Sequence, residues 1–271
     1  MHRNIYEVRW YREENRPYII DIFLFLEVKV VEEFEKYVNN YDLTKEKIIL
    51  KKNHSIRVMN LCVKYAKKLG FNDENISLAK VIGLLHDIGR FEQLKEFNSF
   101  DDSNIDHADL GVKILFEEGL IKNFWSNKED YELIKFAIKN HNKMKIEETT
   151  NERYLKFAKL IRDIDKMDII YLLGYLSELD TKPSNDLINP KITNSIKNHE
   201  LSNYKDIKNI NDSIALKFAY TYDINYDECL EEFKQNLYYF YKQINFDERF
   251  KEIFETVNKY IDERIDKYVR N

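Results

Sequence analysis

The sequence predicts an all-α fold. Its 271 residues include only 6 glycines and 3 prolines, which are few for a protein with many turns and strands. No proline lies between Pro17 and Pro183, so long helices can continue there without a break. Apolar residues recur at helical spacing along most of the chain. The length fits one large domain, or a domain with an appendage, that buries a sizeable core.

Nine helices are expected from the apolar stripes. Residues suited to an N-cap precede the second, third and fourth helices, and Gly70 lies where a C-cap glycine belongs after the second. The N-cap candidates are, in order, Asp42 or Thr44, Asn72 or Asp73, and Asn104 or Asp106. The expected helices cover residues 18–40, 44–69, 74–89, 107–118, 129–142, 152–178, 210–221, 226–243 and 247–268.

Two segments interrupt the helical pattern. The polar stretch "GRFEQLKEFNSFDDSNID", residues 89–106, is expected to be a loop that forms a lid or a pocket wall. The stretch "LDTKPSNDLINPKIT", residues 179–193, holds two of the three prolines and is the best candidate for a domain boundary. We therefore expect a helical core with its N-terminal helix over residues 1–180. A C-terminal helical extension over residues 181–271 is expected to pack on that core.

The charge pattern argues against a nucleic-acid partner. The formal net charge is −5, with acidic and basic residues interspersed, whereas proteins that neutralise phosphates usually carry a basic stripe. The most apolar stretch, "YIIDIFLFLEVKVV", is too short to span a bilayer, and the N-terminus lacks the apolar region of a signal peptide. Cys62 and Cys229 are expected to be buried free thiols, as in a reducing compartment. These features predict a soluble cytoplasmic protein that binds neither nucleic acid nor a membrane.

One apolar run contains two ionisable residues. The run "VIGLLHDIGR", residues 81–90, places His86 and Asp87 side by side among apolar neighbours. Burial of a lone ionised carboxylate costs so much free energy that the group must be neutralised, paired or bound to a metal. The pair therefore predicts partners elsewhere in the chain.

Other ionisable residues continue the apolar stripes of the predicted helices, so they also point inward. A single inward histidine is more often a hydrogen-bonded core residue than a ligand, and a single inward aspartate can be half of a salt bridge. Imidazole and carboxylate groups that point inward from several helices are instead what a metal site in a helical core requires. The inward residues are His54 in the second predicted helix, His107 at the start of the fourth, His141 in the fifth, and Asp165 and Asp168 in the sixth.

The order of these residues resembles the HD superfamily of metal-dependent phosphohydrolases. The signature of that family is His, then His-Asp, then Asp on consecutive helices of a helical core, and the last aspartate here lies in the phrase "IRDIDKMD". The resemblance covers about residues 50–172 and places the last ligand at Asp165 rather than Asp163. It implies an HD-domain helical core, to which this chain adds N- and C-terminal helices. The residues that carry it are His54, His86, Asp87 and Asp165.

The two further histidines imply a second metal. Members of the family with two histidines between the His-Asp pair and the last aspartate hold two metals, which the aspartate of the pair bridges. One carboxylate can bridge ions about 3.5–4 Å apart. The expected cofactor is two divalent transition-metal ions, Mn or Fe first, with Ni, Co or Zn as alternatives. By the resemblance, the first metal binds His54, His86, Asp87 and Asp165, and the second binds Asp87, His107 and His141.

The resemblance implies hydrolysis of a small phosphomonoester or nucleotide by a metal-activated water. Asp87 and Arg90 are the catalytic candidates. Arg90 lies three residues after Asp87, so its guanidinium can reach the site and bind phosphate, or it can simply stabilise a helix C-terminus. Lys143 and Lys166 are further candidates for substrate binding, although most lysines in such a chain are solvated.

Two other function classes remain open at this stage. Mixed-valent di-iron oxygenases share the fold and the order of six ligands, and ligand identity does not separate iron from manganese. A non-catalytic nucleotide sensor is the third hypothesis, although a degenerate site is expected to have lost some ligands. The partner expected in each case is a small molecule, which is phosphorylated in the hydrolase and sensor cases. A homodimer is left open.

Overall fold

The structure is a computed structural model that describes residues 19–175 and 182–270, with side chains described from residue 29 onward. Its regular structure is helical, and no strand occurs in the described ranges, which confirms the all-α fold class. None of the helices in these ranges is both long and apolar enough to cross a membrane. The α-helices are α1 (Ile19–Val38), α2 (Glu46–Lys68), α3 (Asp73–Leu85), α4 (Ile88–Phe97), α5 (His107–Val112), α6 (Tyr131–Asn140), α7 (Glu152–Tyr175), α8 (Pro190–Lys197), α9 (Ile210–Ala219), α10 (Leu230–Gln243) and α11 (Lys251–Arg270).

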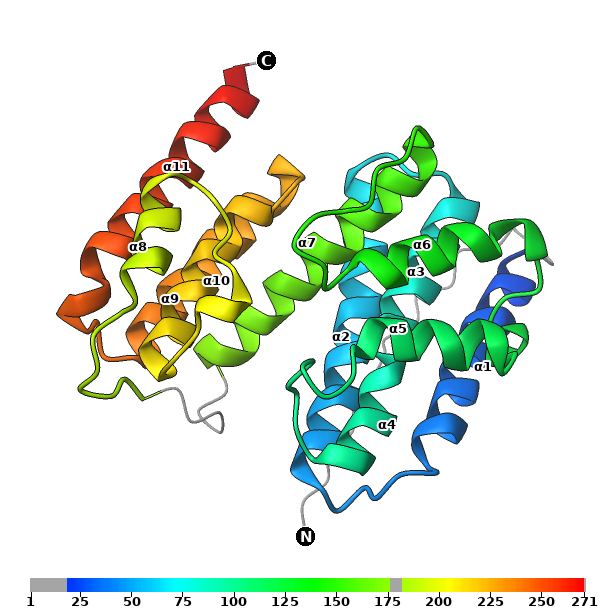
Figure 1. Ribbon diagram of the computed structural model, residues 1–271. Helices are drawn as coiled ribbons and strands as arrows, with labels where there is room; N and C mark the ends of the chain where they lie inside the picture. The colour runs from blue at the N-terminus through cyan, green and yellow to red at the C-terminus, as the bar shows by residue number, and fades with distance from the viewer. Residues whose placement is uncertain (1–18, 176–181, 271) are drawn as a thin grey trace, which may run out of the picture.

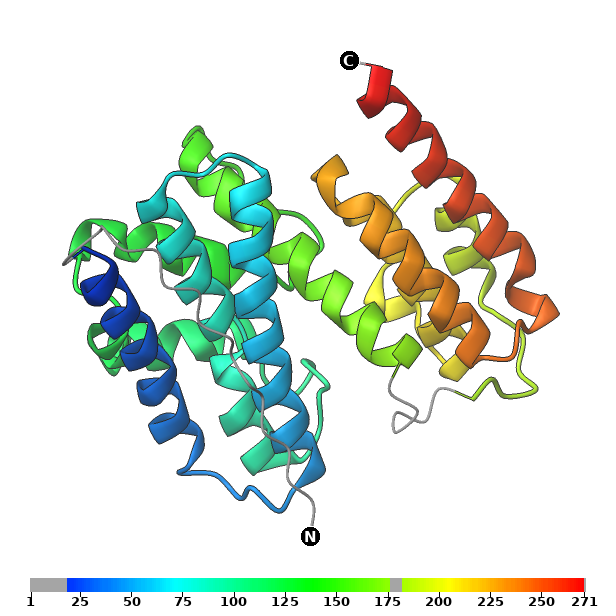
Figure 2. The same cartoon turned by 180° about the vertical axis from the view of Figure 1, so that it is seen from behind.

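Helix α7 connects two groups of helices. Helices α1 to α6 lie on one side of the molecule and α8 to α11 on the other, and α7 runs from the first group into the second (Figure 1). The view from behind shows the same arrangement (Figure 2). Helix α2 packs along α3 and α7, α6 also packs on α7, and α10 covers the C-terminal half of α7. The same helix therefore contributes to both groups.

The segment 89–106 is only partly a loop. The prediction was wrong for its first half, because α4 covers Ile88–Phe97. Phe91 and Leu94 of this helix are buried at helical spacing, Gln93 between them is buried as well, and Lys95 and Glu96 on the other side are exposed. The predicted third helix, 74–89, is likewise two helices: α3 ends at Leu85, and Asp87 has a non-helical backbone (φ −104°, ψ 17°) before α4 begins. The chain thus breaks at the His-Asp pair.

Two of the three predicted N-caps are present. The side chain of Asn72 accepts a hydrogen bond from a backbone N–H of the first turn of α3, and Asp106 does the same for α5. For α2 the prediction was wrong, because its N-cap is Lys45, which makes no side-chain capping bond. Asp42 instead accepts from the backbone N–H of Thr44 and stabilises the preceding turn.

The C-terminal region contains one helix that was not predicted. Helix α8 begins with Pro190 at its first position, is capped by the side chain of Asn189, and buries Ile192 and Ile196. It lies at the end of the segment proposed as a boundary. Residues 176–181 lie outside the described residues, as does the predicted end of the sixth helix, so the division at 180 stays a prediction. Cys62 and Cys229 are free and buried.

The backbones of α4 and α5 touch at two glycines. A Cβ atom on Gly89 would lie 2.2 Å from the carbonyl oxygen of His107 and 2.6 Å from the backbone nitrogen of Gly111. Contacts this short exclude any side chain at position 89. Because His107 begins α5 and Asp87 precedes α4, this crossing brings the two residues together.

Candidate metal centre

Six ionisable side chains converge from four helices and one helix break. All are buried, with at most 9% of any residue exposed. They fall into two groups in which the possible ligand atoms lie within 4.8 Å of one another, with Asp87 in both. His54 lies in α2, His86 and Asp87 at the break between α3 and α4, His107 at the start of α5, His141 at the end of α6, and Asp165 in the middle of α7.

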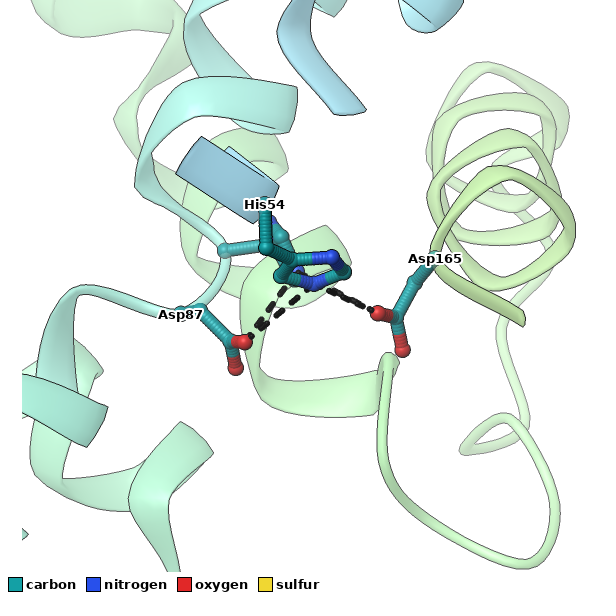
Figure 3. Close-up of side chains that lie close together, drawn as sticks. His54, Asp87 and Asp165 are labelled. Carbon is teal, nitrogen blue, oxygen red and sulfur yellow. Dashed lines mark hydrogen bonds and ion pairs between the residues drawn. The ribbon is translucent and has the colours of Figure 1, made fainter. Parts of the chain in front are cut away.

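The first group surrounds the Nε2 atom of His54. This atom lies 3.1 Å from Oδ1 of Asp165, 3.2 Å from Nε2 of His86 and 3.4 Å from Oδ2 of Asp87. Figure 3 shows the His54 ring between the two carboxylates. The His86 Nε2 atom is 3.4 Å from the same oxygen of Asp165. Four possible ligand atoms therefore face one point.

The second group uses the other oxygen of Asp87. Its Oδ1 atom lies 3.2 Å from Nε2 of His107 and 3.6 Å from Nε2 of His141. The two imidazole nitrogens are 2.9 Å apart. Because Oδ2 of Asp87 faces the first group and Oδ1 the second, this carboxylate has the orientation that a bridging ligand requires.

The hydrogen bonds at the far side of each imidazole test whether these residues fit metal ions. Every Nδ1 atom faces an oxygen that can only accept, so Nδ1 carries a proton, and each ring presents the lone pair of Nε2 to the centre when it is neutral. Facing lone pairs repel unless a proton or a cation lies between them, and metal-binding histidines are commonly held in this way. The residues therefore fit divalent metal ions. The acceptors are Asp168 Oδ2 for His54 (2.6 Å), the Gly83 carbonyl for His86 (2.8 Å), Asp102 Oδ1 for His107 (2.8 Å) and the Ile138 carbonyl for His141 (2.6 Å).

The charges in this cluster shift the pKa values of its members. Burial lowers the pKa of His141 to about 4, so this imidazole is neutral. Burial also acts to lower the pKa of His54, but hydrogen bonds with the surrounding carboxylates outweigh it and raise that pKa to about 10. Burial acts to raise the pKa of Asp165, yet hydrogen bonds with His54 and His86 hold it well below its usual range. A divalent ion that binds the first group displaces the proton of His54.

Asp168 orients the first ligand, a role that the sequence analysis did not assign. Its Oδ1 atom accepts a 2.8 Å hydrogen bond from Nε of Arg57, and its Oδ2 atom accepts from His54. Burial acts to raise the pKa of Asp168, but the bonds with His54 and Arg57 lower it, so the carboxylate stays ionised. Asp168 lies one helical turn after Asp165, and this spacing was the signal available in the sequence.

Replacement of Asp168 by asparagine is expected to weaken metal binding at the first group by about 10- to 100-fold, because His54 loses its orienting carboxylate. Titration of the metal-free protein with Mn²⁺ measures this effect. Asp163→Asn is the matched control: Asp163 is an equally buried carboxylate of α7, but it accepts from the backbone N–H groups of Asn225 and Tyr226. Equal loss of metal affinity in both variants would refute the orienting role.

Two cations lie beside Asp87. The Nζ atom of Lys51 is 2.5 Å from Oδ2 of Asp87, and this lysine, one turn before His54, was not singled out from the sequence. The Nε atom of Arg90 is 3.7 Å from Oδ1 of Asp87 and has no hydrogen-bond partner. The predicted proximity of Arg90 to Asp87 is therefore present in the structure.

The loop after α4 forms one wall of the site. Asp102 in this loop accepts hydrogen bonds at Oδ1 from Nη1 of Arg90 and from His107, both at 2.8 Å. Burial acts to raise the pKa of Asp102, but these two partners lower it below its usual range. Nη1 of Arg90 also donates to the carbonyl of Phe100 at 2.9 Å. The loop thus fixes both a candidate ligand and a candidate substrate-binding residue.

The two predicted substrate-binding lysines have other partners. Lys143 pairs with Asp106 at 2.6 Å and with Asp109 at 3.1 Å. Lys166 is buried and pairs with Asp223 at 2.7 Å. Neither ammonium lies within 4.0 Å of a candidate ligand carboxylate in the described part of the chain, so their role in substrate binding stays a prediction.

Comparison with protein families places the whole cluster in one matched region. Residues 52–170 match the family model described as the HD domain. The matched range begins two residues before His54 and ends two residues after Asp168, and it contains all six candidate ligands. No curated protein and no solved structure matches the chain.

Proposed function

We propose that this chain, whose residues 52–170 match the family model of the HD domain, is a metal-dependent phosphohydrolase that acts on a small phosphomonoester or nucleotide. The observation that carries the proposal is the orientation of Asp87, whose two carboxylate oxygens face two separate groups of imidazole nitrogens. This arrangement suits two divalent ions that share one carboxylate, and Mn²⁺ and Fe²⁺ both accept such mixed nitrogen and oxygen ligands. The metal identity and the number of ions are part of the proposal.

Charge supports an anionic substrate. Two divalent ions, when bound, lower the pKa of a water molecule and polarise a phosphoryl group. The ligand carboxylates Asp87 and Asp165 neutralise only part of that positive charge. The ammonium of Lys51 and the guanidinium of Arg90 both lie beside Asp87, so they add to the positive charge around the site.

Arg90 is the residue best placed to bind the phosphoryl group. Its Nη1 atom is held by Asp102 and the carbonyl of Phe100, so the guanidinium plane is fixed. Its buried Nε atom has no hydrogen-bond partner and lies on the side of Asp87. A fixed planar donor suits the geometry of phosphate oxygens.

The test is a screen of phosphate release from small phosphomonoesters and nucleotides. We expect activity with Mn²⁺ or Fe²⁺ that EDTA abolishes and that either metal restores. Oxygen uptake is recorded on the same samples. A metal-loaded protein that consumes oxygen but releases no phosphate would be an oxygenase, and one that binds nucleotides without turning them over would be a sensor. Either result would refute the phosphohydrolase proposal.

A further inference from the structure

The C-terminal group of helices places a lysine beside a tyrosine that packs against α7, the helix that carries Asp165. Lys217 lies in α9 and is partly buried. Its Nζ atom donates a 2.9 Å hydrogen bond to the hydroxyl of Tyr220 and lies 4.7 Å from the centroid of that ring. Tyr220 is buried, and its hydroxyl also accepts from Tyr204 at 3.5 Å. The position of the ammonium is therefore fixed by the extension itself.

Charged contacts hold this part of the extension against α7 next to Asp165. Asp223 accepts from Nη2 of Arg162 at 2.6 Å and pairs with Lys166 at 2.7 Å. Asp163 accepts from the backbone N–H groups of Asn225 and Tyr226, both at 2.8 Å. These residues of α7 flank Asp165 in the sequence. The segment after Tyr220 thus lies on the part of α7 that supplies the metal ligand.

Tyr220, the hydrogen-bond partner of Lys217, lies against α7, and its ring centroid is 5.6 Å from Nζ of Lys166, the residue after Asp165. Burial lowers the pKa of Lys217 below its ordinary value, although the charges of Tyr204 and Asp165 act to raise it. Lys217 and Asp165 do not form an ion pair, so the Lys217 ammonium and the Asp165 oxygens are more than 4.0 Å apart. Lys217 therefore lies beside the turn of α7 that carries Asp165, without forming an ion pair with it.

Lys217 also differs from the other cations around the site. Each of those has a carboxylate within 4.0 Å, whereas Lys217 has none among the described residues. A partly buried ammonium without a counter-charge is costly, so an anion that reaches it binds favourably. The paired cations are Lys51 with Asp87, Arg57 with Asp168, Arg90 with Asp102, and Arg162 and Lys166 with Asp223.

We propose that Lys217, positioned by Tyr220, binds a second anionic group of the substrate, so that the C-terminal extension selects phosphoesters that carry a carboxylate or a further phosphate. This inference rests on the proposed function for the first anionic group, the phosphoryl group at the metals. The selecting residue lies outside the matched range 52–170. The extension, rather than the matched domain, would therefore supply this contact with the substrate.

Binding of non-hydrolysable phosphonates tests the proposal without any turnover. The probes are propylphosphonate, 3-phosphonopropionate and 1,3-propylenediphosphonate, titrated by calorimetry into the Mn²⁺-loaded protein. The first carries one anionic group, and the others add a carboxylate or a second phosphonate. We expect at least one of the two doubly anionic probes to bind about tenfold more tightly than propylphosphonate, the size of one charged hydrogen bond. The probe that binds more tightly shows whether the second anionic group is a carboxylate or a phosphate.

Variants assign the gain to Lys217. Lys217→Met is expected to remove the preference and to leave the affinity for propylphosphonate within about twofold, and Tyr220→Phe is expected to reduce the preference. Lys197→Met is the matched control, because Lys197 is an exposed lysine of the extension that pairs with Glu252. Elemental analysis checks that each variant keeps its metal.

Two results would overturn the inference. The first is a wild-type protein that binds all three phosphonates equally, or binds none of them. The second is a Lys217→Met protein that keeps the preference. A protein that prefers a doubly anionic probe through Lys217 yet releases no phosphate from any ester would support the anion site and refute the phosphohydrolase, so the two proposals fail separately.

Discussion

Substitution of Asp87 by asparagine is expected to empty both metal sites and to lower phosphate release by about a thousandfold, or about 4 kcal/mol of transition-state stabilisation. Both oxygens of this carboxylate face possible ligands, Oδ2 toward His54 and Oδ1 toward His107. Asparagine offers one oxygen and no negative charge, so it cannot serve the two groups together. Elemental analysis and the phosphate assay on the same preparation measure the effect.

Asp109→Asn serves as the control for this variant. Asp109 is an exposed carboxylate of α5 whose ion-pair partner is Lys143. Thermal unfolding of both variants shows whether the fold is kept. An Asp87→Asn protein that retains two ions per chain would contradict the bridging geometry.

The two sites are expected to be separable by mutation. His107→Ala or His141→Ala should lower the metal content from two ions toward one, because only the second group loses a ligand. His54→Ala or Asp165→Ala should cost chiefly the first ion. Each change removes one ligand from a pocket that several helices line, rather than a large apolar side chain, so the helical fold is expected to survive. Metal content and thermal unfolding are measured together.

His199→Ala is the control for these variants, because His199 stacks on Tyr222 at a centroid distance of 5.4 Å and belongs to neither group. If His107 and His141 are ordinary packed residues, their loss will change stability and leave the metal content unchanged. Unchanged content in both variants would leave at most a one-metal hydrolase. It would also remove the oxygenase alternative, which needs both irons.

Three of the six candidate ligands could be predicted because they continue the apolar stripes of their helices, and His86 and Asp87 because they are ionisable residues within an apolar run. Helical spacing alone predicted that His54, His141 and Asp165 lie on the core-facing side of their helices. Asp165 lies in the first group while Asp163 bonds to the extension, an arrangement compatible with the resemblance, which assigns the ligand to Asp165 rather than Asp163. Local periodicity therefore indicated which side chains point inward, and the family resemblance divided them into two groups.

The residues around the ligands could not be predicted in the same way. Lys51 reaches Asp87 across 36 positions, and Asp102 lies in a loop whose fold no periodic pattern describes. The position of Lys217 depends on how the segment Tyr220–Asp223 packs on α7, which is a tertiary contact. Side chains placed by long-range packing leave no local signal in a single sequence.

The break at the His-Asp pair was missed for a different reason. Leu84, Leu85 and Ile88 are all buried, on both sides of the break. A run that is apolar on every face shows no stripe, so its pattern does not reveal where one helix stops and the next begins. The missed α8 has only 8 residues, which is too few for a clear period.

Residues along α7 contact two different parts of the molecule in turn, and this couples the two groups of helices. Asp165 and Asp168 of this helix face the metal centre, while Arg162, Asp163 and Lys166 bond to the segment 223–226. Loss of Asp223 from that segment would leave Arg162 and Lys166 without their carboxylate, in the helix that also carries a candidate ligand. Substitutions on the two surfaces are therefore expected to be coupled. The residues that support this centre extend beyond the matched range 52–170. Transplanting the centre into another scaffold would therefore require the extension as well.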